Sequence, residues 1–593
     1  MFETIINLSR RTACVALAAL LPTACVSGNV GGTDASVKEL IKVCPKGDDC
    51  IPGEPVEQGR SLSGNFLAGR HAQAGRDMSI AADFMGEALK KSPDTSDLLR
   101  RTFVLMTAEG RMSEAAPLAR RVIEANDKEP IAAMLLAVDD IKNGRYAEAE
   151  KRMTSLPEHG INMYVTPVVS AWARIGMGKS AEDAIEALKG LDEKNGSKAL
   201  HDLHSALIND VAGNADAAEK GFMDAVKSQG GVSLRLAQLF GNLLERRGKT
   251  GEAKILYQTY IAAHPDSRIL AHALARIEKK AVPPPEVATA VDGVAEGLFG
   301  ITGSLSQQNA QETALVLGRM ALHLKPDFAV MQILLADIFE ADGRLKLANS
   351  VYESIRPDSP FSWTARLNHA TNLDEMNQTD EAIKRLTAMA AAEPDKEESL
   401  VSLGNILSRR ERFAEAAKAF DGAVARIGEP TKKHWLLFYS RGIARERSKQ
   451  WPLAEADFLK ALEFEPEQPY VLNYLGYSWV DQGMHLDRAK DMIRKAVELR
   501  PTDGFIVDSL GWVLYRLGNY EEAVREMERA IELRPQDPVI NDHLGDTYWK
   551  VGRKQEARFQ WRRALSLKPD PELLSTIEMK IKKGLVEKDG KDG

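Results

Sequence analysis

Cysteine is scarce in this chain, and the patterns that mark catalytic sites are missing from it. The 593 residues include 4 cysteines and 11 histidines, and neither a Gly-x-Ser-x-Gly nor a His-Glu-x-x-His motif occurs. The net charge is -7, so the chain lacks the positive excess of nucleic-acid-binding proteins. We therefore expect no enzyme, no cofactor, no metal site, no nucleic-acid partner and no small-molecule substrate.

Two local patterns resemble binding motifs without completing them. The segment GMGKS at 176–180 ends like a phosphate-binding loop, but Ala173 stands where that loop needs a glycine. His201 and His204 in HDLH lie three residues apart with no further ligands nearby, which predicts surface histidines and not a metal pair.

The N-terminus has an uncharged stretch, TACVALAALLPTAC, that is too short to span a membrane. Arg10 and Arg11 precede it, which predicts a secretory signal peptide over residues 1–24. Thr23 and Ala24 precede Cys25, and this site resembles the lipobox of bacterial lipoproteins, in which the cysteine is acylated. We expect a lipidated Cys25 and a periplasmic, outer-membrane-anchored protein. Cleavage nearby with ordinary secretion is the alternative.

Two further cysteines follow in a segment rich in Gly and Pro, residues 25–60, which we expect to be a flexible tether. Cys44 and Cys50 flank the turn-forming spacer PKGDD. An oxidising compartment would preserve a disulfide between them, and a pair of free thiols is the alternative.

A repeat of about 34 residues occupies most of the remaining chain, with a small residue, an alanine twelve positions later and often a closing proline. This spacing predicts two packed helices per repeat, because small side chains let helix axes approach and proline ends the second helix. The alanines of the second helices are Ala81, Ala115, Ala149, Ala184, Ala218, Ala253, Ala314, Ala348, Ala382, Ala416, Ala454, Ala489, Ala523 and Ala557.

The register of the repeat breaks between Ala253 and Ala314, where AVPPPEV cannot continue a helix. Pro283–Pro285 is either a hinge or a rigid kink. The predicted organisation is an N-terminal block over 61–266, a helical and Pro-rich junction over 267–301, a C-terminal block over 302–570, a capping helix over 571–585 and a disordered tail over 586–593.

Repeats of this length with these small residues, aromatics and prolines resemble tetratricopeptide repeats (TPRs). The resemblance implies an all-α, right-handed superhelical solenoid of about fourteen helix-turn-helix repeats in two blocks. In this family the first helix of each repeat lines the concave face. The lysines of the clamp by which some TPR domains hold a C-terminal carboxylate are missing beside Asn242 and Asn405.

The segment from LNYLGYSWVDQGMHLDRAK to INDHLGDTYWKVGRKQEARFQW resembles the C-terminal block of large bacterial TPR lipoproteins of the protease-adaptor type. That resemblance implies a non-catalytic envelope scaffold that brings a carboxyl-terminal processing protease to peptidoglycan hydrolases. The alternative is a structural component of an envelope machine for outer-membrane protein assembly, polysaccharide export, secretion or pilus formation.

The phase of the first helices predicts which side chains face a protein partner. Taking Gly476, Gly511 and Gly545 as packed positions, the residues six and three before and one and four after them should point into the groove. Aromatic side chains supply contact area there, and polar groups fix register. The predicted groove residues are Tyr470, Asn473, Tyr477, Phe505, Asp508, Trp512, Tyr515, Asp542, Asp546 and Trp549.

Overall fold

The computed structural model describes residues 59, 61–126, 128–191, 197–264 and 267–585. Within these ranges the regular structure consists of α-helices α2 to α31 and two 3-10 helices, without any strand. The all-α solenoid class predicted from the sequence is therefore confirmed. The predicted signal peptide, all four cysteines and the tail lie outside the described residues.

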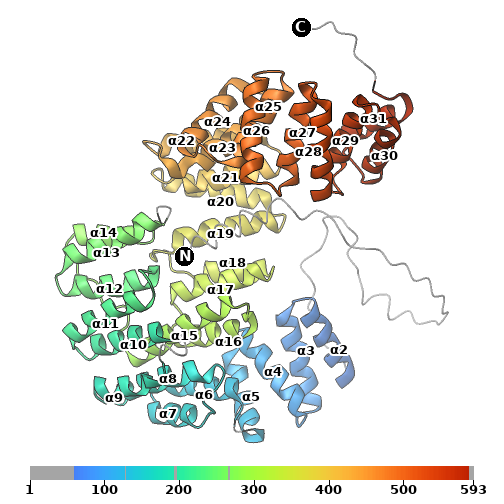
Figure 1. Cartoon of the computed structure of the whole chain (residues 1–593). Helices are drawn as coiled ribbons and strands as arrows, with labels where there is room; N and C mark the ends of the chain where they lie inside the picture. The colour runs from blue at the N-terminus through green and yellow to red at the C-terminus, as the bar shows by residue number, and fades with distance from the viewer. Residues whose placement is uncertain (1–58, 60, 127, 192–196, 265–266, 586–593) are drawn as a thin grey trace. The chain divides into compact units, whose positions relative to one another are not determined.

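Packing divides the chain into unit 1, residues 1–372, and unit 2, residues 373–593 (Figure 1). Most helices of unit 1 pair with the next helix in sequence to form hairpins. Its helices are α2 (Leu62–Ala74), α3 (Met78–Lys91), α4 (Ser96–Ala108), α5 (Met112–Ala125), α6 (Pro130–Lys142), α7 (Tyr146–Thr154), α8 (Asn162–Gly176), α9 (Ala181–Glu186), η2 (Ala187–Gly190), α10 (Lys198–Val211), α11 (Ala215–Ser228), α12 (Leu234–Arg246), α13 (Thr250–Ala263), α14 (Ala271–Glu278), α15 (Ala290–Gln307), α16 (Gln311–Leu324), α17 (Ala329–Ala341), α18 (Leu345–Glu353) and α19 (Ser362–Glu375), which crosses the limit.

Unit 2 continues the same hairpin pattern to the end of the described chain. Its helix α31 covers the last hairpin, where the sequence predicts a capping helix. The helices are α20 (Thr379–Ala392), α21 (Glu398–Arg409), α22 (Phe413–Arg426), η3 (Lys432–His434), α23 (Trp435–Arg447), α24 (Trp451–Phe464), α25 (Pro469–Asp481), α26 (Leu486–Leu499), α27 (Gly504–Arg516), α28 (Tyr520–Leu533), α29 (Pro538–Lys550), α30 (Lys554–Ser566) and α31 (Pro571–Lys583).

The repeated alanines lie where the helices of each hairpin touch. Every one of them, from Ala81 to Ala557, has an exposed fraction of 0%. A larger side chain at these positions would push the two helices apart, because helix axes pack only about 8–10 Å apart. The turn inside a hairpin also follows from sequence: Gly518, between α27 and α28, has φ 80, which glycine adopts without steric cost.

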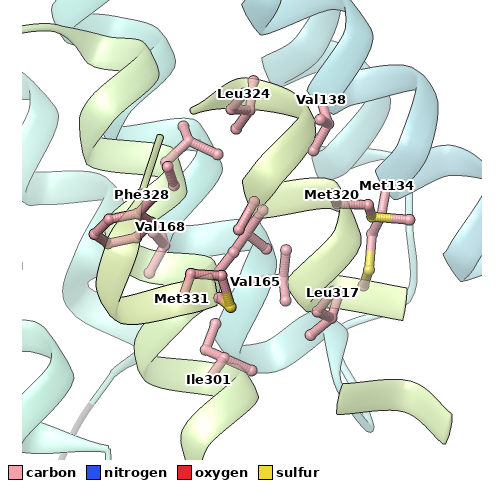
Figure 2. Close-up of a cluster of buried hydrophobic side chains, with 14 of the residues drawn as sticks. Met134, Val138, Val165, Val168, Ile301, Leu317, Met320, Leu324, Phe328 and Met331 are labelled. Carbon is pink, nitrogen blue, oxygen red and sulfur yellow. The ribbon is translucent and has the colours of Figure 1, made fainter. Parts of the chain in front are cut away.

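Unit 1 is more than a linear row of hairpins. Helix α15 packs on α6, α8 and α10, and α16 packs on α4 and α6, although long stretches of sequence separate them. Figure 2 shows the shared core, in which Met134 of α6, Val165 of α8, Ile301 of α15 and Leu317 of α16 lie together. The boundary predicted between the junction (267–301) and the C-terminal block (302–570) falls inside α15. The last part of the junction and the first helix of the block are therefore one continuous helix.

The proline segment before α15 is held by contacts on several sides. The Asn242 side-chain amide donates to the Pro284 carbonyl at 2.8 Å, and Lys325 Nζ donates to the Glu286 carbonyl at 3.2 Å. Arg235 also forms an ion pair with Glu286 at 3.2 Å. These bonds anchor the segment to α12 and to the end of α16.

Candidate protein-binding surface

The glycines that set the predicted groove phase are packing positions in unit 2. A Cβ atom on Gly476 would lie 2.8 Å from Ile493, and one on Gly511 would lie 2.8 Å from Met527. A Cβ atom on Gly545 would lie 2.5 Å from Trp561. Each first helix is thus pressed against its own second helix, and its other faces are left for neighbouring repeats or for a partner.

The predicted groove residues differ widely in exposure. Tyr470 and Phe505 are 37% and 41% exposed, whereas Asp508, Asp542 and Asp546 are 6%, 3% and 5% exposed. The remaining predicted residues are half-buried: Asn473, Tyr477, Trp512, Tyr515 and Trp549. The exposed members lie at the N-terminal ends of their helices, so accessibility is concentrated along one edge.

The three buried aspartates already have partners inside the chain. Asp508 accepts from His543 Nδ1 at 3.0 Å, and Lys580 of α31 lies 2.7 Å from Asp542 and 2.8 Å from Asp546. Trp561 Nε1 also donates to Asp546 at 2.9 Å. These carboxylates therefore join α27, α29 and α31 to one another.

Burial and charge shift the pKa values in this cluster. Burial, reinforced by the neighbouring Asp542 carboxylate, raises the pKa of Asp546 to about 6, against the opposing effect of Lys580. Burial alone would lower the pKa of His543, but the charge and hydrogen bond of Asp508 outweigh it, so that pKa is raised. Proton binding by the cluster is thus coupled to the packing of α27, α29 and α31.

Trp512 lies in an aromatic stack between repeats. Its ring is stacked on Tyr515 at a centroid distance of 4.9 Å and on His543 at 4.1 Å. Its indole N–H is buried and has no hydrogen-bond partner among the described residues. Trp479 and Tyr548, which stand three residues after Gly476 and Gly545, are buried, at 1% and 7% exposed.

Trp549 is half-buried beneath the residues at the end of α31. Its ring lies 5.3 Å from that of Trp561, with Arg558 5.1 Å from its centroid. A Cβ atom on Gly584, just beyond α31, would lie only 2.1 Å from the same ring. Trp549 thus packs against the capping helix, a contact that the sequence reasoning did not foresee.

In unit 1, the face formed by the first helices is covered by other helices of the same unit. The first helices α4, α6, α8 and α10 carry the α15–α16 hairpin, and buried polar contacts fix it there. Arg235 of α12 pairs with Glu296 of α15 at 2.7 Å, and Arg319 of α16 donates to the Ala108 carbonyl at the end of α4 at 3.2 Å. The surface that an open repeat array would offer to a partner is filled along these helices.

The two histidines predicted to lie at the surface differ in position. His204 is fully buried: its Nδ1 accepts a 2.9 Å hydrogen bond from Trp172 Nε1. The surface prediction is therefore wrong for His204, because the face of α10 that carries it is covered by α8 and α15. His201 is half-buried and lies 3.0 Å from Asp202. Within the described ranges, no group of three or more His, Cys, Asp or Glu residues is placed to hold a metal ion.

No helix in the described part of the chain combines the length and hydrophobicity needed to cross a membrane.

Two sets of residues in the folded chain were not identified from the sequence. One is the Gly293 and Gly297 pair of α15, whose four-residue spacing signals close helix packing. The other is the exposed arginines Arg500 and Arg534, which follow α26 and α28 before a proline.

Comparison with known families finds one match that begins just before unit 2 and two that lie inside it. Models described as TPR repeat or tetratricopeptide repeat match residues 367–430, 511–552 and 540–571. A TPR repeat-containing protein of Pseudomonas aeruginosa is 28% identical over 179 residues, which is 30% of this chain and 30% of the relative. The chain thus aligns with less than a third of that relative's length.

Solved structures with related repeats are similar only loosely. The APC/C hetero-tetramer Cut9-Hcn1 has 16% identity and a TM-score of 0.37, covering 83% of this chain and 97% of that chain. Yeast Tom70 has 14% identity and a TM-score of 0.31, covering 88% and 95%. YrrB, a TPR protein with an unusual peptide-binding site, has 20% identity and a TM-score of 0.27, covering 32% and 97%.

The matched segments at 511–552 and 540–571 overlap the α27–α28 and α29–α30 hairpins. Residues 511–552 run from the middle of α27 to the end of α29, and 540–571 contain α30. Within them, Ala523 and Ala557 are fully buried, and Gly511 and Gly545 are tightly packed. The chain therefore contains tetratricopeptide repeats within residues 367–430 and 511–571.

Proposed function

We propose that this chain is a non-catalytic scaffold of the bacterial cell envelope that holds protein partners on unit 2. The observation that carries the proposal is the accessibility of Tyr470 and Phe505 at equivalent places in two consecutive repeats. Large exposed apolar side chains in line are typical of protein interaction sites. Unit 1 supports the assignment to unit 2 because its own α15–α16 hairpin covers its first helices.

The sharper form of the proposal is a lipoprotein adaptor. Acylation of Cys25 would anchor the chain in the outer membrane, and the repeats would bring a processing protease close to peptidoglycan hydrolases. The gain would come from effective concentration, since a tether and several contacts turn later binding steps into intramolecular ones. The N-terminal sequence and the resemblance of the C-terminal repeats to adaptor lipoproteins support this form.

A cross-linked pull-down from native membranes tests the proposal, with the full-length protein compared with Cys25→Ser. Co-enrichment of a processing protease and a cell-wall hydrolase, lost from the membrane fraction in Cys25→Ser, is the expected result. A stoichiometric export or assembly machine without a protease would instead indicate the structural alternative.

A pair of surface variants locates the binding site in the same experiment. Tyr470→Ser with Phe505→Ser should reduce partner recovery. Phe559→Ser is the matched control, because Phe559 is 65% exposed on α30, the second helix of a hairpin. Equal recovery with both variants would contradict the assignment to the exposed edge that Tyr470 and Phe505 form.

A further inference from the structure

An exposed apolar residue recurs at the start of three consecutive first helices. Tyr470, Phe505 and Val539 are 37%, 41% and 41% exposed and occupy the second position of α25, α27 and α29. Equivalent positions of a solenoid lie in a line, since each repeat is displaced by a similar step from the one before. These side chains therefore form a row across three repeats.

Basic side chains accompany this row at the same period. Arg500 lies 5.1 Å above the Tyr470 ring, and Arg534 lies 4.9 Å above the Phe505 ring. Both arginines are exposed, and neither forms an ion pair or a side-chain hydrogen bond with another described residue. Lys568 follows α30 at the corresponding place and is also exposed.

Several buried charges of unit 2 are paired inside the chain, whereas Arg500 and Arg534 have no acidic partner among the described residues. Arg441 and Arg445 both pair with Asp457, and Lys580 pairs with Asp542. The acids of the groove are therefore already engaged and cannot neutralise Arg500 or Arg534. A guanidinium held over an aromatic ring keeps its donors available for an incoming carboxylate.

We name this surface the arginine edge; it consists of Tyr470, Arg500, Phe505, Arg534, Val539 and Lys568. The geometry points to an extended, acidic segment of a partner protein as the ligand of the arginine edge. This inference rests on the proposed scaffold function and specifies its partner. Neighbouring helices pack about 10 Å apart, and an extended chain advances about 3.3 Å per residue. One repeat thus corresponds to roughly three residues, so the segment should carry a carboxylate and an apolar side chain at every third position.

The arrangement favours a peptide over an anionic membrane or a nucleic acid. Asp503 and Asp537 cap α27 and α29, accepting from the backbone N–H groups of Phe505 at 3.2 Å and Val539 at 2.9 Å. In the sequence these aspartates follow Arg500 and Arg534 by three residues, so charges of both signs lie near the starts of α27 and α29. A continuous polyanion would meet both signs, whereas separate carboxylates on a peptide can contact only the cations.

The test measures binding of fluorescent peptides to the full-length chain by anisotropy. One peptide repeats Leu-Glu-Ser, a second repeats Leu-Gln-Ser and a third repeats Ser-Glu-Ser. We expect Leu-Glu-Ser to bind best, and Arg500→Glu with Arg534→Glu to weaken its binding roughly tenfold or more. Phosphatidylglycerol vesicles and a single-stranded oligonucleotide are the competing anionic probes.

The matched control is Arg494→Glu with Arg525→Glu, which places the same charge change on exposed positions of α26 and α28 away from the edge. It should leave peptide binding within about twofold. Equal binding of the Glu and Gln peptides, an equal loss in the control, or tighter binding of the vesicles or oligonucleotide would overturn the inference. Circular dichroism confirms that each variant is folded. If native partners are still recovered with Arg500→Glu and Arg534→Glu, the scaffold function stands and the arginine edge does not.

Discussion

Gly293 of α15 faces the indole ring of Trp172 on α8 so closely that a Cβ atom at Gly293 would lie 2.0 Å from a ring carbon. Trp172 is 0% exposed, and its indole N–H is fixed on His204. Four residues later, a Cβ atom on Gly297 would lie 2.3 Å from Val168. The two glycines let α15 lie directly on α8, which is how unit 1 fills its own first-helix face.

Gly293→Ala should therefore destabilise unit 1, although alanine is the better helix former. Overpacking a core costs about 1–3 kcal/mol, which exceeds the gain of about 1 kcal/mol from helix propensity. Gly300→Ala is the matched control in the same helix, because its Cβ would meet Leu200 at an ordinary 3.6 Å. Hydrogen exchange of peptides from α8 and α15 should be faster in Gly293→Ala and equal or slower in Gly300→Ala. The opposite order would show that α15 is not seated on Trp172.

Unit 1 should lose stability in mild acid through His204. Burial lowers the pKa of this imidazole from 6.5 to about 3. Below pH 6.5 the His204 imidazole of the unfolded chain binds a proton, whereas that of the folded chain binds one only below about pH 3. The free energy of unfolding therefore falls as the pH falls across this window. At pH 5 the loss relative to pH 7 is about 2 kcal/mol.

Hydrogen exchange of α8 and α10 peptides at pH 7 and pH 5, corrected for intrinsic rates, measures this loss. His204→Gln removes the titrating group and should flatten the pH dependence in this window. An unchanged slope in His204→Gln would assign the acid sensitivity to other groups.

The capping helix should depend on Lys580. Lys580→Met leaves Asp542 and Asp546 buried without their cation, and breaking such a pair costs about 3–5 kcal/mol. Exchange in α29, α30 and α31 should accelerate. Lys582→Met, an exposed position on the same helix, should have little effect.

The cost of Lys580→Met should also depend on pH. The folded-state pKa of Asp546 is already raised from 3.8 to about 6, and Lys580 acts to lower it. Without Lys580 that pKa rises further, so the folded variant takes up a proton at a higher pH than the parent, and its defect relative to the parent shrinks as pH falls towards 6. Adding Asp542→Asn and Asp546→Asn should rescue the variant at pH 7. A defect that is constant with pH would show that Lys580 acts only by packing.

The helical repeat could be predicted from the sequence because its signals are local. Small residues at fixed offsets determine how each hairpin packs, and every repeated alanine is indeed fully buried. The packing of α15 on α8 joins residues more than a hundred positions apart, and no periodicity encodes that contact. Only the Gly293 and Gly297 spacing signalled a close approach.

The repeat phase predicts which side chains face the groove, but it does not predict their accessibility. Tyr470 and Phe505 are exposed, whereas Trp549, another of the predicted residues, is half-buried beside Gly584. The partner of Asp546, Lys580, comes from the capping helix that follows the last repeat. Burial of a charge depends on what the last helix covers, and the repeat pattern ends before that helix begins.

Photo-crosslinking from a single position tests the central claim most directly, that protein partners are held on the exposed edge of unit 2. A p-benzoylphenylalanine at position 505 or, as control, at position 559 would be activated in native membranes, and adducts identified by mass spectrometry. Both positions carry an exposed phenylalanine in unit 2. The account predicts covalent adducts with a defined envelope protein from position 505 and none from position 559. Adducts from position 559 alone would place the partner on the second helices and contradict the account.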